Sequence, residues 1–191
     1  MATAEAEEGD RRVGDSAPCI GCGLCCNGVL HEHVDLQADE ADRMRSLGHD
    51  TGLEPEKHSL KLPCTYFGCG TCNNYDQRFS TCRAYRCALL RRYHAGEISL
   101  EQCRSKVEEA KSLADKIRET DPGCDLMANR GAREKALHHA LKAAAPEERM
   151  SIAGRLLNLM ALTRLLETEF RYRKADQERS GEPASVEPEL P

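Results

Sequence analysis

The pattern of apolar and polar residues divides the chain into an irregular first half and a helical second half. From residue 99 onward, apolar residues return every three or four positions, which is the spacing of an amphipathic helix. Ser99 and Gln102 have the spacing of a capping box, so a helix is predicted to begin after Ser99 and to end at residues 121–123. Its apolar stripe consists of Leu100, Cys103, Val107, Ala110, Ala114 and Ile117.

Two further helices are predicted after that break. The first is rich in alanine and covers residues 126–144. Pro146 suits the first turn of the last helix, because the amide hydrogen that proline lacks has no partner there anyway. The stripe of the last helix is broad: Ile152, Ala153, Leu156, Leu157, Leu159, Met160, Thr163, Leu166 and Phe170. A stripe of this width needs other helices or a partner to cover it.

Shorter elements are predicted before residue 99. Residues 36–47 predict a helix with Asp35 as its N-cap and Gly48 as its C-terminal stop. Residues 29–34 predict a short extended segment, and the chain from residue 48 to residue 63 reads as a loop.

Another helix is predicted from about Cys82 to Gly96. Cys82 and Cys87 are five positions apart, so on one regular helix their side chains would point about 140° apart. If both cysteines bind one metal, the helix must begin after Cys82.

Composition changes this picture mainly through the cysteines. The 191 residues include 11 cysteines, whereas aromatic residues make up 4% and tryptophan is absent. So little aromatic bulk implies a modest apolar core, to which metal binding would add stability. The sequence shows neither a secretory leader nor an apolar run of 18 residues, which predicts a reduced, cytoplasmic location without membrane contact. The net charge of −5 gives no basic field, so nucleic acid is not an expected partner.

The first cysteine group has four thiols within residues 19–26, spaced C-x2-C-x2-C-C. The C-x2-C spacing lets a chain curl so that two sulfurs reach one ion, and Gly21 and Gly23 permit the left-handed backbone of such a turn. The first three cysteines also match the start of a ferredoxin run, but its fourth cysteine and proline do not follow. Cys25 and Cys26 are adjacent and their side chains diverge, so one is free to serve a second metal or to bridge two.

The second cysteine group contains Cys64, Cys69, Cys72, Cys82 and Cys87. The order CxxCGxCC, a lone cysteine, then C-x-x-Y-x-x-R-x-x-x-C-R-x-aromatic-x-C resembles the YkgJ-type cysteine-cluster proteins, also described as the CxxCxxCC zinc- or iron-chelating domain. The resemblance covers roughly residues 19–90. The matching residues are Cys19, Cys22, Gly23, Cys25, Cys26, Cys64, Cys72, Tyr75, Arg78, Cys82, Arg83, Tyr85 and Cys87.

This resemblance implies that eight cysteines bind zinc or iron, the iron either as an ion or in an iron–sulfur cluster. The eight are Cys19, Cys22, Cys25, Cys26, Cys64, Cys72, Cys82 and Cys87. The chain departs from the family pattern at Phe79 and Arg86, where the family usually has proline, and Cys69 is additional. We expect these departures to alter the loop over residues 79–86 more than the ligand set.

The number of cysteines leaves the kind of metal site open. Nine lie between residues 19 and 87, whereas a closed zinc site takes four. Two tetrahedral sites, one bridged multinuclear site, or an iron–sulfur cluster with one zinc all fit. Unbound thiols are a weaker reading because exposed thiols oxidise, and a thioredoxin-like pair lacks its βαβ context. For shared sites, residues 19–26 must lie against residues 64–87.

Several other residues are interpreted as bystanders. Cys103 lies on an apolar helical stripe and reads as a small core residue, and Cys124 reads as a free loop thiol. His31 and His33 read as polar residues on a strand edge, because the cysteines already complete a plausible site. Three arginines are expected to offset the thiolate charge through N–H···S contacts: Arg78, Arg83 and Arg86.

Two classes of function fit the sequence. In the first, the protein binds metal in a structural or storage cluster, and its C-terminal helices dock a protein partner. In the second, the cluster belongs to an enzyme, since the resemblance extends to a domain of flagellin lysine N-methylases. We favour the first class, because the sequence shows no recognisable S-adenosylmethionine site and no P-loop or dinucleotide motif.

The predicted fold class is mainly α, with an irregular cysteine-rich metal-binding core followed by an antiparallel helical region. The predicted organisation is a disordered tail over residues 1–17, a cysteine-cluster metal-binding domain over 18–96, a helical region over 97–173, and a disordered tail over 174–191.

Overall fold

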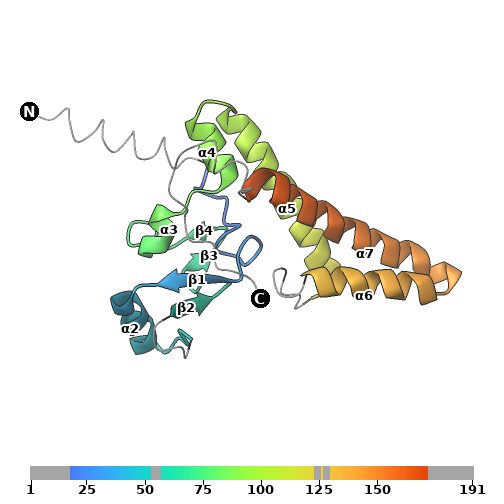
Figure 1. Cartoon of the computed structure of the whole chain (residues 1–191), viewed down its shortest axis with the longest axis horizontal. Coiled ribbons are helices and arrows are strands. Elements are labelled where there is room, and N and C mark those ends of the chain that lie inside the picture. Colours follow the sequence, from blue (N-terminus) through green and yellow to red (C-terminus); the bar gives the residue numbers. More distant parts are fainter. Residues whose placement is uncertain (1–17, 53–56, 123–125, 127–129, 172–191) are drawn as a thin grey trace, which may run out of the picture.

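The structure is a computed structural model that describes residues 18–52, 57–122, 126 and 130–171 (Figure 1). It is mainly α with an irregular cysteine-rich N-terminal part, which confirms the predicted fold class. The predicted tails and Cys124 lie outside the described residues. None of the described helices is long and apolar enough to cross a membrane.

Three long helices form the second half of the chain: α5 (Leu100–Thr120), α6 (Arg130–Ala143) and α7 (Pro146–Leu165). The predicted capping box is confirmed, because the Gln102 amide donates to Ser99 Oγ at 3.2 Å and the Ser99 amide donates to Gln102 Oε1 at 2.8 Å. Pro146 begins α7 as predicted. The helix continues as a π-helix, η1 (Leu166–Phe170).

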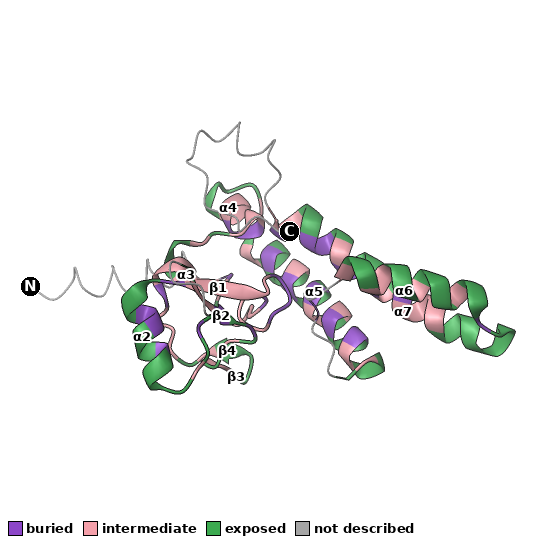
Figure 2. Ribbon diagram, turned by 60° about the horizontal axis from the view of Figure 1, so that its bottom comes forward, coloured by how far each residue is buried: buried purple, intermediate pink, exposed green. Residues whose placement is uncertain are grey.

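Helix α5 packs as its apolar stripe predicts, but the stripe predicted for the last helix is too broad, because Leu157 and Met160 are exposed. Helix α7 pairs with α6 as a hairpin and contacts α5, while the outer end of the hairpin extends away from the cysteine-rich part (Figure 1). Figure 2 shows the buried positions of α5 as a row along one side of the helix. Of the predicted α5 stripe, the following residues are buried: Cys103, Val107, Ala110, Ala114 and Ile117.

The first half contains small elements joined by turns. Strand β1 (His33–Leu36) pairs antiparallel with β2 (His58–Lys61), and helix α2 (Ala38–Ser46) lies between them in the chain. The N-cap of α2 is Gln37, so the predicted cap at Asp35 is wrong: Asp35 belongs to β1, opposite Ser59. Gly48 has a φ of 84°, as expected of a C-terminal stop.

The second cysteine group lies on a small hairpin and two short helices. Strands β3 (Phe67–Gly68) and β4 (Thr71–Cys72) pair antiparallel, and helices α3 (Ser80–Ala84) and α4 (Ala88–His94) follow. The single helix predicted from Cys82 to Gly96 is therefore wrong. Tyr85 and Cys87 have extended backbones, with ψ of 133° and 162°, and they separate α3 from α4.

Two hydrophobic clusters form the core. The main cluster joins Leu24, Val29 and Leu30 of the cysteine-rich part with apolar residues of α4, α5, α7 and η1. The second cluster lies around β1, β2 and α2 and contains Leu36, Ala41, Met44, Leu60 and Phe79. Phe79, which stands where the family usually has proline, is only 3% exposed and packs near Tyr66. The substitution thus contributes a core side chain.

Candidate metal centre

The first cysteine group forms a tight turn built on two glycines. Gly21 and Gly23 have φ values of 80° and 70°, in the left-handed region that disfavours side chains. The Cys22 amide donates to the Cys19 carbonyl at 3.1 Å, which closes the turn. A Cβ on Gly23 would lie 2.5 Å from a ring carbon of Phe67, so a side chain has no room there. The turn predicted from C-x2-C is confirmed.

The second cysteine group folds back onto this turn. The Cys64 amide donates to the Cys26 carbonyl at 2.8 Å, and the Leu62 amide donates to the Glu32 carbonyl at 2.9 Å. These bonds join segments that are far apart in the sequence. The predicted convergence of the two cysteine groups is therefore confirmed for the backbone.

We group four thiols as the first thiol set: Cys19, Cys22, Cys25 and Cys87. Cys22, Cys25 and Cys87 pack against the main cluster, and Cys19 acts electrostatically on all three. Burial raises the pKa of Cys22 to about 12, and the neighbouring thiols Cys87 and Cys19 raise it further than burial alone. Burial also raises the pKa of Cys25 well above its usual value, again with a contribution from Cys87. These thiols lie within electrostatic range of one another, and Cys26 also acts on Cys22 and Cys25.

We group four other thiols as the second thiol set: Cys26, Cys64, Cys72 and Cys82. Cys64 and Cys82 pack against the second cluster, and Cys72 acts electrostatically on both of them and on Cys26. Burial raises the pKa of Cys26 to about 12, and the thiols of Cys72, Cys82 and Cys64 add to this effect. Burial raises the pKa of Cys82 to about 11, with Cys64 and Cys72 as the next contributors.

The adjacent residues Cys25 and Cys26 fall in different sets, although Cys26 acts electrostatically on Cys25. The divergence of their side chains stays a prediction. Cys82 and Cys87 also separate, because the extended residues between α3 and α4 direct them to different sets. Cys69 is exposed, with a φ of 50°, and lies at the tip of the β3–β4 hairpin.

Cys103 is fully buried in α5 and belongs to the main core, as predicted. Burial raises the pKa of its thiol, and Cys19 adds to that effect, so Cys103 lies on the core side of the first thiol set.

Backbone amides point at several of the sulfurs. Cys87 is the N-cap of α4, and its Sγ accepts a hydrogen bond from the Leu90 amide at 3.4 Å. Burial raises the pKa of Cys22 and Cys64, while amide donors at Leu24 and Tyr66 act in the opposite direction. Such donors stabilise a thiolate and offset part of the cost of burying its charge.

Arg78 lies within electrostatic range of one thiol of each set and contacts Tyr75. The Arg78 guanidinium lies 3.7 Å from the centre of the Tyr75 ring, a cation–π contact. Burial raises the pKa of Cys19 and of Cys82, and the charge of Arg78 lowers both. Arg78 Nε and the Tyr75 hydroxyl are buried and have no hydrogen-bond partner among the described residues. Because Arg78 acts on Cys19 and Cys82, its buried Nε suits an N–H···S bond to a metal-bound thiolate.

Arg86 also acts on Cys19, whose pKa is raised by burial and then lowered by Arg78 and Arg86. The Arg86 side chain donates to the carbonyls of Arg83 and Tyr85. The expected contact of Arg83 with a thiolate stays a prediction.

His31 is more enclosed than the edge position predicted for it. Its ring meets that of Tyr85 edge-on at 4.8 Å, and its Nε2 is buried without a hydrogen-bond partner among the described residues. Burial lowers the pKa of His31 to about 4, with further effects from Arg171 and His33, so the ring is neutral near pH 7.

The side chains as they stand do not form a closed coordination shell. Within the described residues, no three Cys, His, Asp or Glu side chains meet closely enough to hold a metal ion. Each cysteine sulfur moves among three staggered positions by rotation about one torsion, χ1. Side-chain rotation is therefore the change by which neighbouring thiols can turn toward a common ion.

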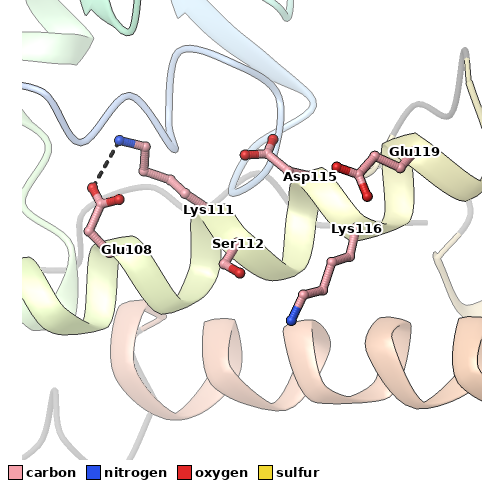
Figure 3. A pocket seen from close by; sticks show the side chains of 6 residues that line it. All are labelled: Glu108, Lys111, Ser112, Asp115, Lys116 and Glu119. Atoms are coloured by element: carbon pink, nitrogen blue, oxygen red, sulfur yellow. Dashed lines mark hydrogen bonds and ion pairs between the residues drawn. The ribbon is translucent and has the colours of Figure 1, made fainter.

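A shallow hollow on α5 is lined by Glu108, Lys111, Ser112, Asp115, Lys116 and Glu119 (Figure 3). Lys111 pairs with Glu108 at 3.0 Å, so this is a solvated helix face of mixed charge. Lys111 also donates to the Gly21 carbonyl at 3.4 Å, and Arg118 to the Asn27 carbonyl at 3.5 Å. Two side chains of α5 thus bind backbone carbonyls in and directly after the first cysteine turn.

Sequence reasoning identified the cysteines by spacing, but it did not assign them to the two thiol sets. It also missed Tyr75 as a buried donor and Phe67 as the ring that closes on Gly23. The tyrosine in the C-x-x-Y-x-x-R spacing was the available signal for the Tyr75–Arg78 pair.

The sequence model of one protein family, described as "CxxCxxCC: Putative zinc- or iron-chelating domain", matches residues 18–120, more than half of the chain. The match contains both cysteine groups and all of α5. No curated protein and no solved structure matches the chain.

Proposed function

The chain belongs to the CxxCxxCC family of zinc- or iron-chelating domains, and from this premise we propose that it holds two metal ions, one in each thiol set. The observation that carries the proposal is the packing of the thiols: Cys22, Cys25 and Cys87 pack against the main cluster, whereas Cys64 and Cys82 pack against the second. We assign the remaining three family-pattern cysteines by the thiols on which they act. The first ion would bind Cys19, Cys22, Cys25 and Cys87, and the second would bind Cys26, Cys64, Cys72 and Cys82.

Four thiolates suit a tetrahedral ion that prefers sulfur, which is the coordination of structural zinc and of iron held by cysteines. Such a site has no open position for water or substrate, so its contribution is to the fold. The two ions would tie together the first cysteine turn, the β3–β4 hairpin, α3 and the start of α4.

The charge of these sites has a source of compensation in the chain. Eight thiolates carry eight negative charges, of which two divalent ions neutralise four. Arg78 lies near Cys19 and Cys82, one from each set, and the Leu90 amide already points at Cys87. These donors favour thiolates over thiols, and we infer that they set how tightly both ions are held.

The role that follows is that of a metal-binding scaffold. Metal holds the irregular half of the chain in place, and the main core links that half to α5, α7 and η1. The helices would then be presented to a protein partner from a base whose shape depends on metal.

Metal analysis of protein purified without oxygen tests the proposal. We expect two ions per chain, either as colourless zinc protein or as iron protein with visible thiolate-to-iron absorption. Serine variants of the neighbours Cys25 and Cys26 should each lose one ion, and from different sites. Double variants show which cysteines share a site. The variant with Cys25→Ser and Cys87→Ser changes two ligands of the same site and should lose only one ion. The variant with Cys25→Ser and Cys72→Ser changes one ligand of each site and should lose both ions.

Cys69→Ser is the matched control, because Cys69 is exposed and lies outside both thiol sets. This variant should keep two ions. A wild-type content of one ion per chain, or loss of both ions in Cys25→Ser with Cys87→Ser, would contradict the two-site arrangement.

A further inference from the structure

Helix α7 carries a second stripe on the side opposite to its buried leucines. Leu156, Leu159 and Leu162 are buried, whereas Met150 and Leu157 are 85% and 65% exposed. The second stripe consists of Glu147, Met150, Gly154, Leu157, Ala161 and Arg164. These positions follow one another at intervals of three and four residues, so they lie within an arc of about 100° on the helix.

The described part of the chain leaves this stripe uncovered. Glu147, Ala161 and Arg164 are exposed, and no atom lies within 4 Å of a Cβ added to Gly154. Figure 2 shows exposed and half-buried residues along the outer hairpin, in contrast to the buried row on α5. Large apolar residues at regular helical spacing on an open face are typical of an interface.

The order of residues along the stripe points to a second copy of α7 as the partner. When two copies lie antiparallel, large residues of one copy face small residues of the other. In antiparallel coiled coils, each first position of the heptad core faces a fourth position of the other helix. With two copies of α7 antiparallel and the two-fold axis between residues 155 and 156, Met150 faces Ala161 and Leu157 faces Gly154. Each large apolar side chain then lies over a small residue.

The same register pairs opposite charges at both ends. Glu147 of one copy faces Arg164 of the other, and two-fold symmetry repeats this pair at the opposite end. A shift by one heptad would place Leu157 opposite Glu147 in one direction and Arg164 opposite Gly154 in the other. The Glu147–Arg164 pairs therefore form in only one of these alignments. An isologous contact of this kind is closed and produces a dimer.

We propose that the protein forms a homodimer through this stripe of α7, with the two helices antiparallel. The dimer would place the two cysteine-rich halves at opposite ends of the paired hairpins, because each hairpin extends away from its own cysteine-rich part (Figure 1).

Sedimentation equilibrium of the full, metal-loaded chain in reductant tests the dimer. The apparent mass should rise with concentration from 21.2 kDa toward twice that value. Leu157→Glu places a carboxylate over Gly154 of the other copy and should weaken the dimer by about tenfold or more. The side chain is already exposed, so the monomer should fold normally, and its circular dichroism spectrum checks this.

A charge exchange tests the alignment. Glu147→Arg and Arg164→Glu should each weaken the dimer, because each brings like charges together, and the double variant should regain the wild-type association. Glu148→Arg is the matched control: it makes the same change one residue off the stripe and should leave association unchanged. A chain that stays monomeric up to about 1 mM, a dimer that is indifferent to Leu157→Glu, or a double variant no stronger than the single ones would overturn the proposal.

Discussion

Gly21 and Gly23 share a left-handed backbone but have different surroundings. Both have φ values near those of left-handed helix, 80° and 70°. A Cβ on Gly21 would meet no atom within 4 Å, whereas one on Gly23 would lie 2.5 Å from the Phe67 ring. The two positions therefore separate the cost of the backbone conformation from the cost of crowding.

Alanine substitutions make use of this difference. Gly21→Ala should lower the free energy of unfolding of the metal-loaded protein by about 1–2 kcal/mol, the cost of a left-handed residue with a side chain. Gly23→Ala should cost more, because it also pushes Phe67 out of place and loosens the contact between the two cysteine groups. Denaturant titration gives both values, and equal losses in the two variants would mean that Phe67 moves away freely.

The thiol pKa values predict how pH controls metal binding. Burial raises the pKa of Cys22 and Cys26 to about 12, far above neutral pH, so these thiols are protonated before metal binds. Metal must therefore displace protons, and metal affinity should fall as pH falls and rise as pH rises toward the thiol pKa. When metal is added to protein that a chelator has made metal-free, a pH indicator should report the release of about one proton per bound thiol. Binding without proton release would contradict the raised pKa values.

At the scale of elements, spacing predicted some features and could not predict others. The Ser99–Gln102 capping box and the first turn of α7 depend on local chemistry, and both were predicted from sequence. The break between α3 and α4 depends on long-range contacts: Phe79 packs in the second cluster, and Tyr85 packs against the main core. Helical spacing over residues 82–96 contains no sign of those contacts, so one helix was predicted where two occur.

The helices and the cysteine-rich elements should respond differently to chelation. Strands β3 and β4 have two residues each and α3 has five, so these elements depend on the turns that the thiol sets hold together. Helices α5, α6 and α7 have 21, 14 and 20 residues and pack on one another. Strong chelation should unfold residues 19–87, while the long helices keep most of their helicity.

Circular dichroism and limited proteolysis during chelation check this expectation. Most of the helical signal should remain while new cleavage sites open within residues 19–87. Unchanged protease resistance there after complete metal removal would mean that apolar packing alone organises the segment.

At the scale of the whole molecule, the two hydrophobic clusters explain why the thiols divide as they do. Cys22, Cys25 and Cys87 pack against the main cluster, whereas Cys64 and Cys82 pack against the second. The spacing of the cysteines along the chain predicts which eight of them belong to the family pattern, because spacing is a local property of the sequence. Their division into two sets was beyond it, because the division depends on which cluster each turn packs against.

The division into clusters makes a reciprocal prediction about two phenylalanines. Phe170 of η1 is 1% exposed in the main cluster, and Phe79 is 3% exposed in the second. Truncation of either to alanine should cost about 3–5 kcal/mol of stability, because each leaves a cavity.

Phe170→Ala should speed metal loss from the first thiol set and Phe79→Ala from the second, since each cavity loosens the packing behind one set only. Transfer of metal to a chelator, followed in time, should then show one fast and one slow ion in each variant. Adding Cys26→Ser to each variant removes the ion of the second set. The ion that remains in the first set should then leave fast when Phe170→Ala is present and slowly when Phe79→Ala is present. Equal acceleration of both ions by either variant would mean that the two clusters act as one core and that the metal sites are not independent.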